Sequence, residues 1–147
     1  MKSTLRLALV FVIATLPAWG ALGEYEGSVG LDQRVLRGDI HEEVRAGYKF
    51  HEMTTADGAL VREYISPEGK VFAITWRARV LPNLEQLLGA YFPRVQQAVQ
   101  ARGHRGGALV IKADDFVYFS GGRMMNFRGS AYLPALMPKN VTAEVVR

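Results

Sequence analysis

Two pairs of side chains in this sequence are suited to acid–base chemistry. His51 and Glu63 lie in neighbouring strand-like runs, where pairing of the strands would put them side by side on one face. Asp114 and Asp115 are adjacent carboxylates in the second strand-rich region. Two carboxylates can act as acid and base when they lie about 5–9 Å apart across a bound substrate. A small hydrolase that uses Asp114/Asp115 or His51/Glu63 is therefore one alternative function.

Each pair also has a purely structural interpretation, which the sequence favours. Oppositely charged neighbours across two strands stabilise a sheet by roughly 0.2–1 kcal/mol, which accounts for such charges without catalysis. Successive residues on a strand or turn point apart, and Asp is common where strands break. Asp114 and Asp115 therefore predict a turn.

The sequence predicts neither a metal site nor another cofactor site. A metal would need two or more of the three histidines to converge with a carboxylate. His51 and Glu52 alternate toward opposite faces of a strand, and His104 lies in a Gly/Arg-rich loop. Ser120 precedes Gly121–Gly122 without a G-x-S-x-G elbow, and no glycine-rich stretch matches a phosphate-binding motif. The absence of cysteine excludes disulfides, thiolate catalysis and iron–sulfur clusters.

A hairpin tip is the other candidate surface. Gly121–Gly122 between two strand-like runs predicts a turn, and Arg123, Met124–Met125 and Arg128 follow it. A solvated tip explains the two arginines without a ligand. Arg123 and Arg128 nevertheless join His51, Glu63, Asp114 and Asp115 as candidate surface residues.

The elements that position these residues begin with three β-rich runs, 48–54, 59–66 and 70–80. The turns Ala56-Asp57-Gly58 and Pro67-Glu68-Gly69 separate them and favour tight hairpins. The resulting register predicts these cross-strand neighbours: Phe50 and Tyr64, Glu52 and Arg62, Thr54 and Leu60, Tyr64 and Phe72, Arg62 and Ile74, Leu60 and Trp76. One face would then be the core and would carry Tyr48, Phe50, Leu60, Tyr64, Phe72, Ile74 and Trp76.

An amphipathic helix is expected to cover this aromatic face. Asn83 can cap it, with Gln86 three residues on, and apolar residues then recur at helical spacing. Pro93 predicts a kink or two abutting helices and should push Phe92 out of the α region. Gly103 ends the element.

The chain returns to strands in "ALVIKAD" and "DFVYFS" and, after Gly-Gly, in "RMMNFRGSAYLP", and Thr142 can cap a closing helical turn. The pattern predicts an α+β fold, with an antiparallel sheet of about five strands in the order β-β-β-α-β-β and one long kinked helix packed on one face. The predicted organisation is a signal peptide at 1–20, a poorly structured or short-helical lead-in at 21–47, and a single α+β domain at 48–147.

The N-terminus has the layout of a secretory signal peptide. Lys2 and Arg6 precede the uncharged run Leu7–Leu16, which is shorter than the roughly 20 residues that a membrane-spanning helix needs. Small side chains favour cleavage after Gly20, with cleavage after Gly23 as the second choice. We therefore expect a periplasmic or secreted bacterial protein without a transmembrane span after cleavage.

The charge of the chain argues against nucleic acid as a partner. The full chain has 18 basic and 14 acidic residues, and loss of Lys2 and Arg6 would leave 16 and 14, a net charge of +2. The basic residues are scattered and form no stripe of the kind that nucleic-acid binding needs. The expected partner is an unknown envelope protein or surface ligand.

Several motifs together resemble one family. "REYISPEGKVFAITW", "LPNLEQLLGAYF", the Asp-Asp pair, "SGG" and "AYLPALMP" cover about Tyr48 to Pro138. In this combination the chain resembles the uncharacterised exported bacterial proteins of domain-of-unknown-function family 2844. The resemblance implies export and a shared small domain, and it assigns no activity, cofactor or site.

The leading functional hypothesis is a non-enzymatic binding or accessory module of the cell envelope, which would use the open sheet face or the hairpin tips. It follows from the lack of a convergent catalytic set in the sequence. A small hydrolase and a structural envelope or surface component are the alternatives.

Overall fold

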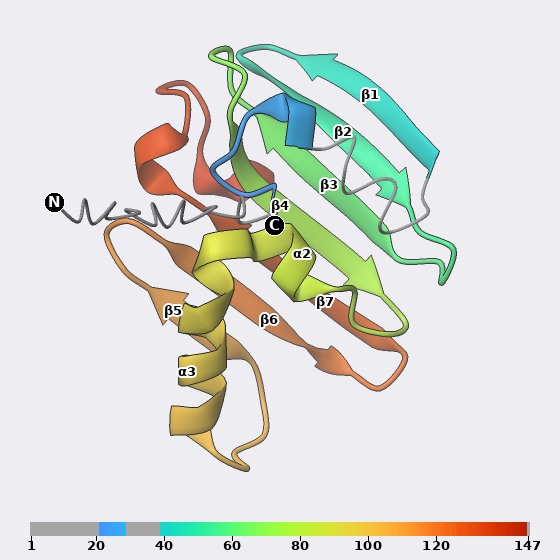
Figure 1. The fold of residues 1–147 in the computed structure, drawn as a ribbon, viewed down its shortest axis with the longest axis vertical. Helices are drawn as coiled ribbons and strands as arrows, with labels where there is room; N and C mark the ends of the chain where they lie inside the picture. Colours follow the sequence, from blue (N-terminus) through green and yellow to red (C-terminus); the bar gives the residue numbers. More distant parts are fainter. Residues whose placement is uncertain (1–20, 29–38, 147) are drawn as a thin grey trace, which may run out of the picture.

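The computed structural model describes residues 21–28 and 39–146, and its main element is a seven-stranded antiparallel sheet (Figure 1). The strands are β1 (Asp39–Arg45), β2 (Tyr48–Thr54), β3 (Leu60–Ile65), β4 (Val71–Ala78), β5 (Leu109–Lys112), β6 (Val117–Arg123) and β7 (Asn126–Tyr132). The helices are α2 (Leu84–Leu88) and α3 (Phe92–Arg102), with short 3-10 turns η1 (Glu26–Ser28), η2 (Gly89–Tyr91), η3 (Pro134–Leu136) and η4 (Ala143–Val146). The strand order is β1-β2-β3-β4-β7-β6-β5, so β4 and β7 join two meanders into one sheet.

The α+β class is confirmed, and the expected count of about five strands is wrong because it omits β1 and does not count β5 and β6 separately. β1 lies in the segment 21–47, where the charged sequence "DIHEEVR" shows no alternation. Charged side chains are typical of an edge strand, which has a neighbouring strand along one edge only and solvent along the other. At the other edge, Asp114 and Asp115 form the predicted turn, and the two runs beside it are separate strands, β5 and β6, although the expected order has only two strands after the helix.

The register predicted between β2 and β3 is confirmed, and the register between β3 and β4 is displaced by one residue. Ile65 pairs with Val71 as expected, but a bulge follows and sets Tyr64 opposite Ala73. Because side chains alternate along a strand, this extra residue turns Ile74 and Trp76 to the face opposite Phe72.

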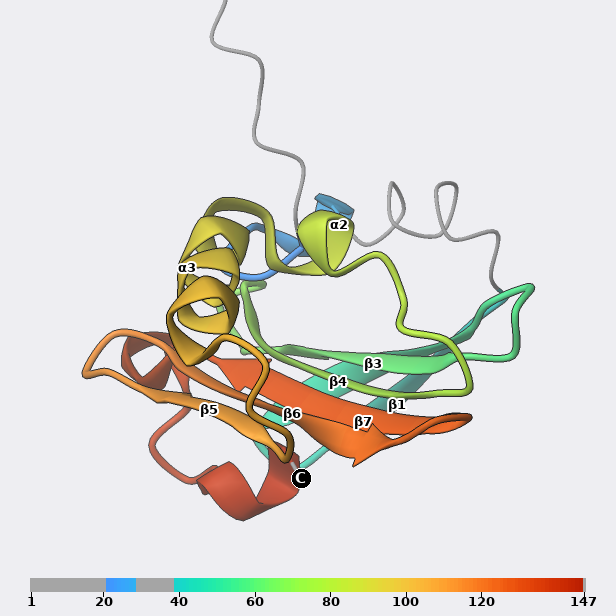
Figure 2. The ribbon, with the colours of Figure 1, turned by 90° about the horizontal axis from the view of Figure 1, so that it is seen from below.

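The bulge divides the expected core face between two cores, one on each side of the sheet (Figure 2). On the side of α2 and α3, Ile74 and Trp76 pack with helix residues such as Leu87 and Val95. On the other side, the aromatic cluster comprises Phe50, Tyr64 and Phe72, with Tyr48 packed against it. The C-terminal segment covers this aromatic cluster through Val141 and Val146, so the helices cover only the Ile74 and Trp76 part of the face that the sequence predicts.

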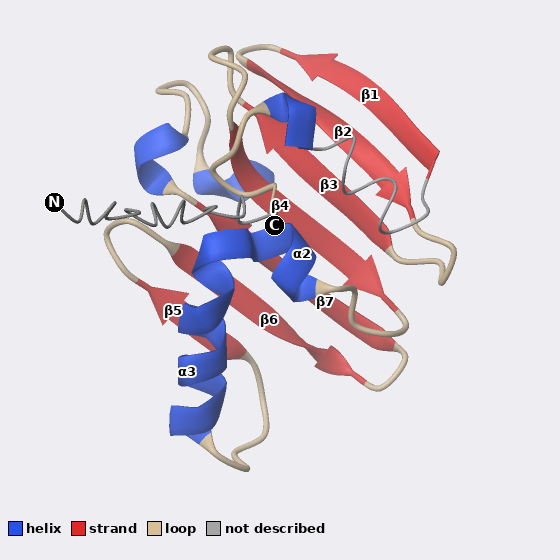
Figure 3. Cartoon of the chain, in the orientation of Figure 1, coloured by secondary structure: helices blue, strands red, loops and turns tan. Residues whose placement is uncertain are grey.

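The helical segment is divided as the sequence suggests, although the break has a different cause (Figure 3). Asn83 caps α2 by accepting a hydrogen bond from the Gln86 amide at 3.1 Å, as predicted. The chain then turns at Gly89, whose φ of 50° is in the region that favours glycine. Phe92 has helical angles, φ −59° and ψ −40°, contrary to the prediction, and Pro93 lies in the first turn of α3, where its missing N–H leaves no hydrogen bond broken.

The Gly-Gly turn is also corrected. Gly121 and Gly122 lie inside β6, and the two residues between paired Arg123 and Asn126 are Met124 and Met125. A Cβ on Gly122 would lie 2.2 Å from the backbone oxygen of Asn126, so close approach of the neighbouring strand requires glycine at this position.

Residues 21–28 are part of the folded domain. Ala21 and Leu22 are buried in the helix-side core, and the Gly23 amide donates a hydrogen bond to the Val71 oxygen at 2.8 Å. The expected signal peptide and residues 29–38 of the expected lead-in lie outside the described residues. None of the helices in the described part of the chain has the length and apolar character needed to span a membrane.

Candidate functional site

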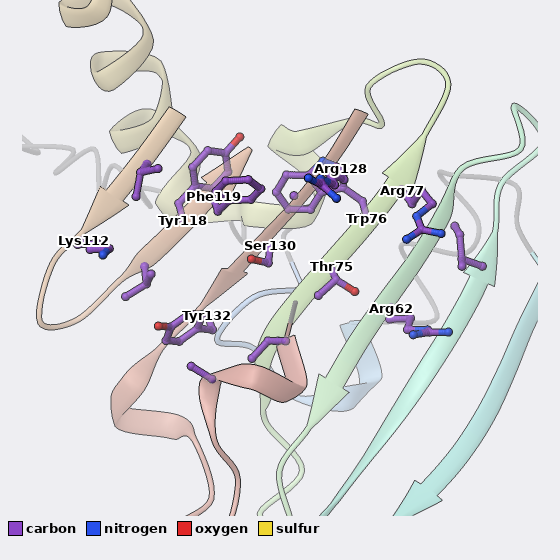
Figure 4. Close-up of a pocket in the computed structure, with 16 residues that line it drawn as sticks. Arg62, Thr75, Trp76, Arg77, Lys112, Tyr118, Phe119, Arg128, Ser130 and Tyr132 are labelled. Carbon is purple, nitrogen blue, oxygen red and sulfur yellow. The ribbon is translucent and has the colours of Figure 1, made fainter. Parts of the chain in front are cut away.

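A concave surface lies on the sheet face opposite α3, and we call it the arginine hollow. Its volume is about 680 Å³, within the range of small-molecule sites. It spans β3, β4, β7, β6 and β5, and η4 closes one end (Figure 4). The lining residues are Leu60, Arg62, Thr75, Trp76, Arg77, Val110, Lys112, Val117, Tyr118, Phe119, Arg128, Gly129, Ser130, Tyr132, Ala143 and Val146.

Strand pairing explains why these side chains meet. Residues that pair across neighbouring antiparallel strands point to the same face. One row across the sheet contains Arg62, Thr75, Ser130, Phe119 and Val110. The next row, toward the end of β4, begins with Leu60 and continues through Arg77 and Arg128 to Gly121.

The hollow is cationic, since four of its lining residues are Arg or Lys and none is acidic. Arg62 is neutralised from outside the hollow: its Nε donates a hydrogen bond to Glu52 at 2.6 Å, as the sequence predicts for this pair. This bond holds the pKa of Arg62 above its ordinary value. Arg77 and Arg128 lie directly opposite one another, and among the described residues no ion pair joins either of them to a carboxylate.

The other end of the hollow is mostly apolar and has one basic lining residue, Lys112 of β5. Val117 and Phe119 on β6 and Val110 on β5 line this end, and Val146 of η4 closes it. Tyr132 lies between Ala73 and Val117 in the third row of the face. The arginines therefore lie on β3, β4 and β7, and the apolar side chains lie on β5, β6 and η4, together with Lys112 of β5.

The carboxylate pair Asp114/Asp115 has a structural role outside the hollow. Arg94 of α3 donates two hydrogen bonds to Asp115, at 2.8 and 3.0 Å, and so joins the helix to the β5–β6 turn. The arginine lowers the pKa of Asp115, mainly through these hydrogen bonds. Asp114 is exposed in the same turn.

His51 and Glu63 pair across β2 and β3 as predicted, on the helix side of the sheet and therefore away from the hollow. Glu63 is 1 % exposed. His51 Nε2 lies 2.8 Å from Glu42 Oε2 and 3.4 Å from Glu26 Oε1, while its Nδ1 is buried with no hydrogen-bond partner among the described residues.

Glu26, Glu42 and His51 offer three potential metal ligands within 4.8 Å of one another, a convergence that the sequence does not predict. Lys49 is part of the same cluster, with its Nζ at 2.5 Å from Glu26 and 3.1 Å from Glu42. The hydrogen bonds from His51 and Lys49 lower the pKa of Glu42. The lysine ammonium therefore already supplies the positive charge that the two carboxylates require, so we interpret this cluster as an ion-pair network that fastens η1 to β2.

The structure does not bring the candidate surface residues together in one site. His51 and Glu63 lie on β2 and β3, and Asp114 and Asp115 follow β5 at the opposite edge of the sheet. Arg128 lines the hollow, whereas Arg123 is exposed at the end of β6. Sequence reasoning did not identify Arg77 as a site residue, because the pairing of β4 with β7 joins segments about 50 residues apart.

Comparison with known proteins agrees with the resemblance seen in the motifs. A family model described as "Protein of unknown function (DUF2844)" matches residues 18–146. No curated protein and no solved structure matches the chain. The match covers nearly the whole chain, and the chain therefore belongs to domain-of-unknown-function family 2844.

Proposed function

We propose that the protein is a non-enzymatic binding module of the bacterial cell envelope and that the arginine hollow is its binding site. The ligand is an organic anion with a phosphate or carboxylate group and an apolar part. The observation that carries this proposal is the Arg77–Arg128 pair, two like charges placed directly opposite one another with no ion-paired carboxylate in the described part of the chain.

Like charges directly opposite in a sheet destabilise it, so the pair is not explained by folding. A bound oxyanion would turn the repulsion into a favourable arrangement, because guanidinium groups donate paired hydrogen bonds to carboxylates and phosphates. Thr75 and Ser130 lie next to the two arginines in the adjoining row and supply hydroxyl donors.

The apolar end of the hollow supports a ligand that is more than an inorganic ion. Val117, Phe119 and Val146 would lie beside the part of the ligand that carries no charge. Binding sites for small molecules commonly combine an apolar lining with a few polar groups that fix orientation.

The composition of the hollow also supports binding over catalysis. General acid–base catalysis most often uses histidine, and neither histidine nor a carboxylate lines the hollow. The two pairs that suggest a hydrolase, Asp114/Asp115 and His51/Glu63, lie outside it.

Calorimetric titration with phenyl phosphate tests this proposal. We expect saturable binding that weakens with added salt, and weaker binding of inorganic phosphate, which lacks the apolar part. The double variant R77Q/R128Q should lose about tenfold or more in affinity, because each charge-assisted hydrogen bond contributes roughly 1.5–3 kcal/mol. The control R105Q/K139Q removes the same charge from exposed positions outside the hollow and should bind like the wild type. Absence of phenyl phosphate binding, or equal loss in both double variants, would refute the assignment.

Export is the second part of the proposal, and the packing of residues 21–23 supports cleavage after Gly20. Cleavage after Gly23 would remove Ala21 and Leu22, which are 0 % and 3 % exposed, from the helix-side core. N-terminal sequencing of the protein recovered by osmotic shock should therefore read Ala21 first. Recovery only in the cytoplasm with Met1 intact would contradict this part.

A further inference from the structure

Two adjoining loops at one end of the sheet gather apolar side chains in solvent. Val80 and Leu81 follow β4, and Met124 and Met125 form the turn between β6 and β7. They are 63 %, 42 %, 87 % and 51 % exposed, and they make up half of the eight large exposed hydrophobic residues in the described part of the chain. Both ribbon views show the two loops side by side (Figures 1 and 2), and we call this surface the methionine tip.

The turn at this tip places a methionine in a backbone conformation that favours glycine. Met125 has φ +68°, and it is the one residue other than glycine with positive φ in the described ranges. A left-handed position in a two-residue hairpin normally carries Gly or Asn, because a side chain there is strained. A strained and half-exposed methionine indicates that its side chain serves a purpose other than stability.

The tip is also cationic. Arg79 and Arg123 flank the apolar residues directly, and both are exposed. No acidic residue occurs from 76 to 84 or from 117 to 130. The carboxylate in the adjoining β2–β3 turn, Asp57, lies beyond β3.

We propose that the methionine tip docks on an anionic phospholipid surface, with Met124 and Met125 inserted among the lipids and the arginines at the headgroups. Peripheral membrane binding combines burial of exposed apolar side chains with attraction between basic residues and anionic lipid. The tip offers both, whereas a protein partner would be expected to meet a broader surface than two loop ends provide. This docking does not depend on ligand binding in the arginine hollow.

Co-sedimentation with vesicles tests the proposal. The full chain is expressed, and the protein is used as it accumulates, with its N-terminus determined, because an uncleaved Leu7–Leu16 run could itself bind lipid. The probes are vesicles of phosphatidylglycerol and phosphatidylcholine in equal parts, and vesicles of phosphatidylcholine alone. Wild-type protein should bind the anionic vesicles, and addition of 0.5 M salt, on the order of the concentration that screens surface charges within a few ångströms, should release most of it.

Two variants and one control isolate the tip. M124S/M125G should bind anionic vesicles at least about tenfold more weakly, because two apolar side chains are lost. R79Q/R123Q should bind anionic vesicles about 30-fold more weakly, because each basic residue near an anionic surface contributes about 1 kcal/mol. The control V44S/V99S changes two exposed valines on β1 and α3 and should bind like the wild type.

Misfolding would not explain a loss of vesicle binding by M124S/M125G, because glycine at position 125 adopts the positive φ without strain. M124S/M125G should therefore unfold at the same denaturant concentration as the wild type or a higher one. Unchanged vesicle binding by M124S/M125G would overturn the proposal, as would failure of the wild type to bind anionic vesicles. Tip-dependent self-association without vesicle binding would overturn it as well and would assign the surface to a second copy of the chain.

Discussion

The pairing of Arg77 with Arg128 leads to an unusual prediction, which is that removal of either charge stabilises the protein. Both side chains are exposed, and they lie directly opposite one another on β4 and β7. For two unit charges about 6 Å apart in a water-like dielectric, the repulsion is about 0.7 kcal/mol, within the roughly 0.2–1 kcal/mol typical of cross-strand charge pairs. Arg77→Gln or Arg128→Gln should therefore raise the free energy of unfolding by about 0.2–0.7 kcal/mol, or the midpoint by about 1–4 °C.

Denaturant unfolding of the wild type, the two single variants and the double variant measures the stabilisation and the interaction energy between the two arginines. The stabilisation should be largest at low ionic strength and should shrink in high salt, because exposed charges are screened. The double variant should gain little beyond either single variant, since one substitution already removes the repulsion. Arg105→Gln, in an exposed loop away from the pair, serves as the control. A decrease of more than about 1 kcal/mol in the free energy of unfolding of both single variants would refute the reasoning, because the arginines would then stabilise the fold.

Three further predictions concern contacts that stabilise the fold. Gly129→Ala should destabilise the protein by about 1–3 kcal/mol in denaturant unfolding, because a Cβ there would lie 2.1 Å from the Trp76 ring; an unchanged unfolding midpoint would contradict this. Asn83→Ala should lower the free energy of unfolding by about 1 kcal/mol because the α2 cap is lost, whereas Asn83→Ser should retain most of the stability. In an NMR pH series, the pKa of Asp115 should lie below the ordinary Asp range, and it should return to that range in Arg94→Gln. The contribution of Asp115 to the free energy of unfolding should be complete above its unfolded-state pKa and should be lost as the pH falls through the lowered folded-state pKa.

The parts of the fold that local signals determine were predictable. Both turns flanking β3 carry glycine at the position where φ is positive, Gly58 at 73° and Gly69 at 78°, and the β2–β3 register follows from the first of them. The cross-strand pair of Glu52 and Arg62 was found in the same way.

The bulge in β4 could not be predicted, because the strand is apolar on both faces. Val71, Phe72, Ala73 and Ile74 are all 0 % exposed, so a shift of one residue leaves an apolar side chain toward each core. The alternation that normally fixes register is therefore missing at this point. This is also why the sequence does not reveal that the helix covers one face and the C-terminal segment the other.

The arginine hollow could be predicted only in part. Arg128 was identified because it lies near a glycine-rich hairpin, and Arg62 because it pairs with Glu52 within a local meander. Arg77 acquires its significance from the contact between β4 and β7, which no turn or local pattern specifies. Alternation of Arg128, Ser130 and Tyr132 along β7 is the signal that could have indicated a polar face.

The most direct test of the arginine hollow is an NMR titration of the labelled protein with phenyl phosphate, followed through backbone amides and arginine Nε–H groups. The account predicts progressive shifts at Arg77 and Arg128 and at the neighbouring residues Thr75, Ser130 and Phe119, with α3 and the Glu26–His51 cluster unaffected. Shifts confined to the helix side of the sheet, or no shifts at saturating ligand, would contradict it.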